Sequence, residues 1–97
     1  MKVKEISNEI AELLEKKNKD YGNSFDKTVE EYGATAYLLR IEDKISRLKS
    51  ITKNKEILVT DESMEDTIKD IAGYSILMLN YLQAKQEARK PRINEVK

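Results

Sequence analysis

Residues 65–79 read EDTIKDIAGYSILML, and this stretch constrains the fold more than any other in the chain. Between Ile71 and Leu82, small or apolar side chains occupy nearly every angle around a helix, so this helix has no wholly polar side. Such a helix is buried on two sides, between layers of a bundle or in a subunit interface. A mid-helix glycine, Gly73, costs about 1 kcal/mol relative to alanine, which indicates that another element packs closely there.

The other apolar residues recur every three or four positions, which is typical of amphipathic helices. The short segment SFDKTVEEY has Ser24 as its expected N-cap and Gly33 after its last turn. Phe25, Val29 and Tyr32 are expected on its inner face. We predict an all-α fold, a small bundle of about four helices, two of them long, over residues 3–18, 24–32, 34–52 and 62–88.

A chain of 97 residues forms a single small domain, which we place at residues 1–90, followed by a flexible tail at 91–97. The helix before the tail ends ahead of Pro91, because proline disfavours helix at the residue before it. A domain this small has a thin stability margin, so we expect the bundle to be completed by oligomerisation as a homodimer or larger assembly.

The chain carries 18 basic and 18 acidic residues and has no cysteine or histidine. A balanced charge gives no support to general nucleic-acid binding. Without Cys or His, thiol or histidine catalysis and zinc sites are excluded, and only oxygen-ligand metal chemistry remains. No run of about 18 apolar residues occurs, so we expect no membrane partner and a soluble, cytoplasmic protein.

Two aspartates stand where the last long helix begins. Asp66 and Asp70 fall in line with Gly73 and Leu77 on a second side of the helix. That side lies opposite the main apolar stripe, which consists of Met64, Ile68, Ile71, Ser75, Met78, Leu79 and Leu82. The pair is either a set of solvated first-turn acids that favour the helix N-terminus or a Mg²⁺ site at the mouth of a buried cleft.

Residues of the preceding helix leave similar alternatives open. Glu42 is the acid that we expect to join Asp66 and Asp70 around Mg²⁺, as metal ligands and catalytic residues. The cations of RIEDKISRLK either form a solvated face with ion pairs along the helix or bind phosphates. In the second case Arg40, Lys44 and Arg47 bind the phosphates.

The stretch NKDYGNSF supplies further candidates for substrate binding. Tyr21 and Phe25 flank a Gly-Asn turn, where they either stack on a nucleobase or serve as a boundary and a core aromatic. The set that we assign to substrate binding is Lys19, Tyr21, Asn23, Phe25, Arg40, Lys44, Arg47 and Tyr74.

Three stretches, DYGNSFDK (20–27), RIEDKISRLK (40–49) and DTIKDIAGYSILML (66–79), together resemble the nucleotide modification associated domain 1 family, which is frequent in phages and prophages. The resemblance spans roughly residues 17–82. That family is similar to the all-α nucleotide pyrophosphohydrolases of the MazG and dimeric dUTPase type. Those enzymes are Mg²⁺-dependent helical dimers or tetramers that cleave a nucleoside triphosphate between its α and β phosphorus atoms.

The resemblance implies a metal-binding role for Asp70, with Asp66 and Glu42 beside it. The related enzymes carry paired acids three residues apart, whereas this chain has DxxxD and no acid three residues after Glu42. Two functions follow as hypotheses. One is Mg²⁺-dependent hydrolysis of a nucleoside triphosphate, or a modified one, to monophosphate and pyrophosphate. The other is non-catalytic sequestration of a nucleotide or cyclic nucleotide between subunits, as an anti-defence protein in a phage host's cytoplasm.

Overall fold

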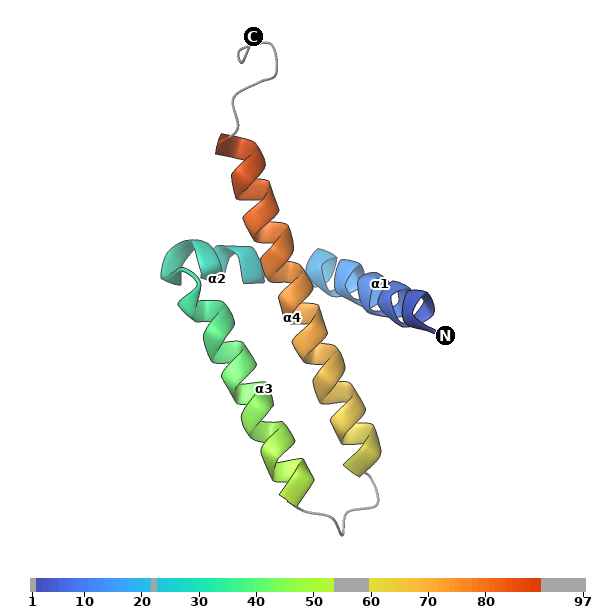
Figure 1. Cartoon of the computed structure of the whole chain (residues 1–97). Helices are drawn as coiled ribbons and strands as arrows, with labels where there is room; N and C mark the ends of the chain where they lie inside the picture. The colour runs from blue at the N-terminus through green and yellow to red at the C-terminus, as the bar shows by residue number, and fades with distance from the viewer. Residues whose placement is uncertain (1, 22, 54–59, 90–97) are drawn as a thin grey trace.

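The computed structural model describes residues 2–21, 23–53 and 60–89, without the side chains of residues 18, 20, 21, 60 and 61. These ranges are helical almost throughout, and they contain no strand. The predicted all-α bundle is therefore confirmed, while the predicted tail at 91–97 lies outside the described residues. The elements are α1 (Val3–Tyr21), α2 (Ser24–Tyr32), α3 (Thr35–Lys53) and α4 (Thr60–Arg89), shown in Figure 1.

The short helix α2 has the predicted bounds but a different cap. Asn23 is the N-cap residue, with a left-handed φ of 62°, and Ser24 is already helical. The prediction of Ser24 as the N-cap was wrong because asparagine tolerates the left-handed conformation that this turn requires. Gly33 ends the helix with φ 74°, and its N–H donates to the carbonyl of Val29 at 2.7 Å.

Helices α3 and α4 run side by side in opposite directions (Figure 1). The hydroxyl oxygens of Tyr37 and Ser75 are 2.8 Å apart. Ser75 donates its own proton to the carbonyl of Ile71 at 2.8 Å, so Tyr37 is the donor between the helices. About two turns further along α3, Lys44 Nζ lies 3.0 Å from Asp70 Oδ2. These two contacts set the register of the pair.

A small core lies where α2 meets the pair. Its buried apolar members are Phe25, Val29, Ala36 and Met78. Tyr32 was also expected there, but 65% of its surface is exposed. That expectation was wrong because Tyr32 is the last residue of α2, where the chain leads away from α4 toward α3 (Figure 1).

Helix α4 packs on two sides, as predicted, but the two sides differ in their neighbours. Helices α2 and α3 cover one side, and α1 crosses the other at Gly73 (Figure 1). A third side is bare, since Ile68, Leu79 and Leu82 are 51%, 56% and 43% exposed. The expectation that they belong to a buried stripe does not hold within one chain, because α3 occupies only part of the arc that they span. No described helix has the length and apolar content needed to cross a membrane.

Glu30 ties α2 to α4 and should make stability depend on pH. Lys85 Nζ donates to its Oε1 at 2.8 Å and Tyr81 Oη donates to its Oε2 at 2.5 Å. Both hydrogen bonds hold the pKa of the Glu30 carboxyl below its ordinary value. A lowered folded-state pKa adds stability above the unfolded-state pKa, and this contribution disappears as pH falls through the lowered value.

We predict that Glu30→Gln makes the free energy of unfolding depend less on pH in the acid range. Urea unfolding between about pH 6 and pH 3 should show a smaller loss of free energy of unfolding in the variant than in the wild type. Glu31→Gln is the matched control, because Glu31 is exposed and makes no ion pair with any described residue. Parallel profiles for Glu30→Gln and the wild type would contradict the assignment.

Gly73 is the point of closest approach between α1 and α4. A Cβ atom there would lie 3.1 Å from Leu14 Cδ2. Gly73→Ala should change the free energy of unfolding by less than about 1 kcal/mol, because the end of a leucine side chain can shift and alanine favours helix. Gly73→Leu should cost about 1–3 kcal/mol and speed amide exchange in α1, because α1 must move. Ala84→Leu, on an exposed part of α4, is the size-matched control and should leave α1 unchanged.

Candidate functional site

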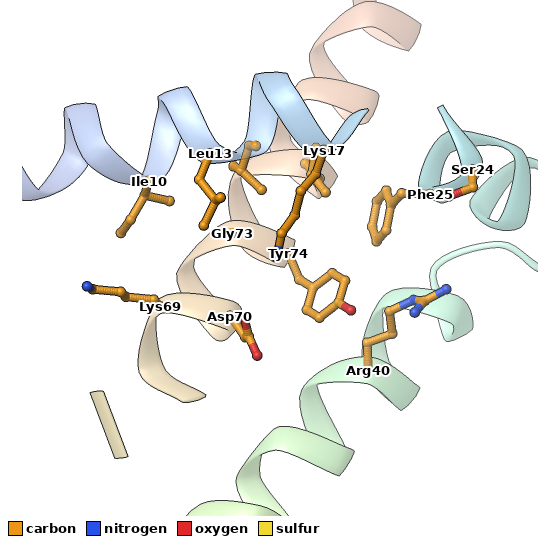
Figure 2. A pocket seen from close by; sticks show the side chains of 12 residues that line it. Ile10, Leu13, Lys17, Ser24, Phe25, Arg40, Lys69, Asp70, Gly73 and Tyr74 are labelled. Carbon is orange, nitrogen blue, oxygen red and sulfur yellow. The ribbon is translucent and has the colours of Figure 1, made fainter. Parts of the chain in front are cut away.

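A cavity of about 270 Å³ lies where α1 crosses the other helices (Figure 2). All four helices contribute to its walls. Helix α1 supplies an apolar roof, α4 forms the floor, and α2 and α3 close one end. The lining residues are Ile10, Leu13, Leu14, Lys17, Ser24, Phe25, Arg40, Lys69, Asp70, Gly73, Tyr74 and Leu77.

An aromatic pair with a cation beside it forms one end of this cavity. The rings of Phe25 and Tyr74 are stacked, with centroids 6.1 Å apart and planes inclined by 28°. The guanidinium carbon of Arg40 lies 5.3 Å from the centre of the Tyr74 ring, within cation–π range. Figure 2 shows Tyr74 in the middle of the site, with Phe25 and Arg40 on the same side of it. Tyr74 therefore contacts both α2 and α3 at the cavity.

Two of the charged groups on the wall already have partners. Asp70 is paired with Lys44 at 3.0 Å. The ammonium of Lys69 points away from Tyr74 (Figure 2) and lies 3.4 Å from Glu65 and 4.0 Å from Glu9. These pairs cancel much of the charge of both groups.

Lys17 and Arg40 are the remaining cations. Within the described residues, neither one pairs with a carboxylate. They enter the cavity from α1 and α3 respectively (Figure 2). The site thus combines aromatic and aliphatic walls with two positive charges that have no carboxylate partner in the described part of the chain, which is an arrangement for a flat apolar group joined to an anion.

The cavity volume limits what can be enclosed. Drug-sized ligands fill pockets of about 300–1,000 Å³, so a cavity of about 270 Å³ is slightly smaller than this range. A flat group of one or two fused rings suits this volume, with the charged part of a larger molecule left at the rim.

Three of the eight predicted substrate-binding residues line the cavity, and a fourth is paired with a lining residue. Phe25, Arg40 and Tyr74 line the cavity, and Lys44 contributes through its ion pair with Asp70. Three others do not line it, namely Lys19, Asn23 and Arg47. Lys19 follows Lys17 by two residues and so points elsewhere on α1. The Tyr21 side chain lies outside the described residues.

The three acids predicted as metal ligands do not meet within one chain. Asp70 lines the cavity, whereas Asp66 is exposed one turn nearer the start of α4. Glu42 precedes Lys44 by two residues, so it lies on the far side of α3 from Asp70. No group of three acidic side chains among the described residues is placed to hold a metal ion. One chain therefore does not fit a three-carboxylate Mg²⁺ site.

Three polar residues of the cavity were not among the predicted site residues: Lys17, Ser24 and Lys69. Lys17 continues the stripe formed by Ile6, Ile10 and Leu13 on α1, so a lone cation on an otherwise apolar stripe was the available signal. Ser24 was interpreted as a cap or as a contact to a base edge or a phosphate, and it lines the cavity directly after the left-handed residue Asn23.

Comparisons with known proteins place the chain in a family. Neither the curated proteins nor the solved structures contain a significant match. Residues 17–82 match the family model described as nucleotide modification associated domain 1. The matched segment runs from Lys17 through α4 beyond Leu77 and so includes the whole aromatic and charged part of the cavity. Since it covers more than half of the sequence, the chain belongs to the nucleotide modification associated domain 1 family.

Proposed function

We propose that the protein binds a nucleotide in the cavity between its four helices. The observation that carries this proposal is the aromatic pair Phe25–Tyr74 beside two cations, Lys17 and Arg40, that lack carboxylate partners among the described residues. The family's description, nucleotide modification associated, points to the same class of ligand.

The base is expected against the aromatic pair. A nucleobase that stacks on an aromatic side chain gains about 1–3 kcal/mol, whichever base it is. Tyr74 is only partly buried and stands in the middle of the cavity, so its ring is the accessible stacking surface, while Phe25 is 95% buried and supports it. Ile10 and Leu77 complete an apolar enclosure around a flat ring.

The phosphates are expected near Arg40 and Lys17. Arginine offers a planar set of donors that matches phosphate oxygens, and lysine adds a point charge. Asp70 would repel phosphates if it were alone, but its pairing with Lys44 reduces that repulsion. Because Mg²⁺ can bind through one carboxylate and substrate phosphates, Asp70 is the residue that would contact an ion arriving with the nucleotide. Binding of the base requires no such ion.

We predict that Arg40→Gln and Lys17→Gln each weaken nucleotide binding about tenfold or more, because each removes a charged hydrogen bond to phosphate. Isothermal titration calorimetry with nucleoside mono-, di- and triphosphates, with and without Mg²⁺, measures this loss. Lys27→Gln is the matched control, since it removes the same charge from the outer side of α2.

A nucleoside, which has no phosphate, should bind the wild type weakly. Its dissociation constant should be the same for the Arg40→Gln variant as for the wild type. Binding that falls equally in all three variants would contradict a specific phosphate site and indicate a general effect of net charge. Failure of every nucleotide and nucleoside to bind would refute the proposed function.

Hydrolysis is a second candidate, favoured by the position of Asp70 on the cavity wall next to the expected phosphates. The resemblance of residues 17–82 to the family related to the pyrophosphohydrolases supports it, whereas the DxxxD spacing departs from the acid pairs of those enzymes. We expect a hydrolase to release pyrophosphate from a nucleoside triphosphate in Mg²⁺ and to lose this activity in Asp70→Asn. A protein that only sequesters its ligand would return it unaltered after heat denaturation, and Asp70→Asn would leave the ligand intact as well.

A further inference from the structure

The layer formed by α3 and α4 has two sides, and only one is covered. The cavity and α1 lie on one side. On the other, four large apolar side chains are exposed, and we name them the bare face: Leu38 (55% exposed), Ile45 (42%), Ile68 (51%) and Leu79 (56%).

Contacts of α3 fix the direction of its half of the bare face. Tyr37 and Lys44, seven residues apart, both point at α4. Arg40 is turned to one side of that line and lines the cavity. Leu38 directly follows Tyr37, and Ile45 directly follows Lys44. Each therefore lies about 100° around the helix from the line toward α4, on the side opposite to Arg40. They therefore lie on the side of α3 away from the cavity.

Contacts of α4 give the same result. Gly73 faces α1 and Ser75 faces α3. Ile68 and Leu79 lie about 140° around the helix from Gly73, on the side away from α1. The antiparallel register set by the two interhelical contacts places Ile45 at the level of Ile68. The four side chains thus form one apolar surface across both helices.

We propose that the bare face is the interface of a homodimer, covered by the same face of a second copy. In a two-fold symmetric dimer each patch must complement itself. Helix α3 has 19 residues and so is about 28 Å long, and two packed helices are about 20 Å wide. A surface of these dimensions covers about 560 Å², which corresponds to a small interface rather than to the standard one of about 800 Å² per partner.

Charges around the bare face favour a second copy as the occupant. Glu42 and Lys49 are exposed on the same side of α3 as Ile45, Glu42 about one turn before it and Lys49 about one turn after it. Two antiparallel copies of α3 can set Glu42 of each copy near Lys49 of the other, so unlike charges meet at both places. The whole chain has no net charge, so two copies do not repel one another overall. The cavity stays open in this dimer because it faces the other way.

Sedimentation velocity of the full chain tests the proposal. We expect the wild type to sediment with twice the monomer mass of 11.2 kDa. Ile45→Glu and Leu79→Glu should sediment as monomers with unchanged helical circular dichroism, since both positions are exposed within one chain. Ile6→Glu is the control, because Ile6 is an equally exposed apolar residue of α1, and it should remain dimeric. A monomeric wild type, or a dimer lost only in Ile6→Glu, overturns the proposal.

Thiol labelling gives a second readout that does not depend on a charged substitution. The chain has no cysteine, so a single introduced one reports on its own position. Ile45→Cys should react with a maleimide at least tenfold more slowly than Ile6→Cys, and dilution should remove the difference. Equal rates at every protein concentration would show that nothing covers the bare face and would overturn the proposal even if the glutamate variants fail to fold.

Discussion

Tyr74 of α4 connects α2 and α3 at the cavity. Its ring stacks against Phe25 of α2, and the guanidinium of Arg40 of α3 lies over the ring. At the preceding residue, Gly73, α1 packs closely against α4. The same side chain therefore belongs to the core and to the wall of the cavity. Because the core is small, the side chains that pack the helices together also shape the cavity. A substitution of Tyr74 should therefore affect both the packing of the helices and the shape of the cavity.

Helix α4 explains why so small a chain can support a site. Different sides of α4 face α3, α1 and the bare face, so the proposed ligand and the proposed second copy would occupy different sides of this helix. Ion pairs connect α4 to two of its neighbouring helices, α3 and α2. Lys44 holds Asp70 at the cavity, and Lys85 holds Glu30 at the contact with α2. We infer that a second copy adds stability without closing the cavity.

The sequence predicted the helices well and the site only in part. Spacing of apolar residues gave the four helices within a few residues, and the cost of Gly73 correctly indicated a close neighbour, which is Leu14. Periodicity shows which residues share a side of one helix but not which sides of different helices meet. For this reason Glu42 was expected beside Asp70, where the structure places Lys44, and the contribution of Lys17 from α1 went unnoticed.

The most direct test of the central claim uses the single phenylalanine of the chain, Phe25. Protein labelled with fluorophenylalanine has one ¹⁹F resonance, which reports on the aromatic wall of the cavity. Titration with a nucleotide should shift this resonance, with a dissociation constant equal to that from calorimetry, because the base changes the ring's surroundings. A nucleotide that binds by calorimetry and leaves the resonance unmoved would show that the ligand site is elsewhere.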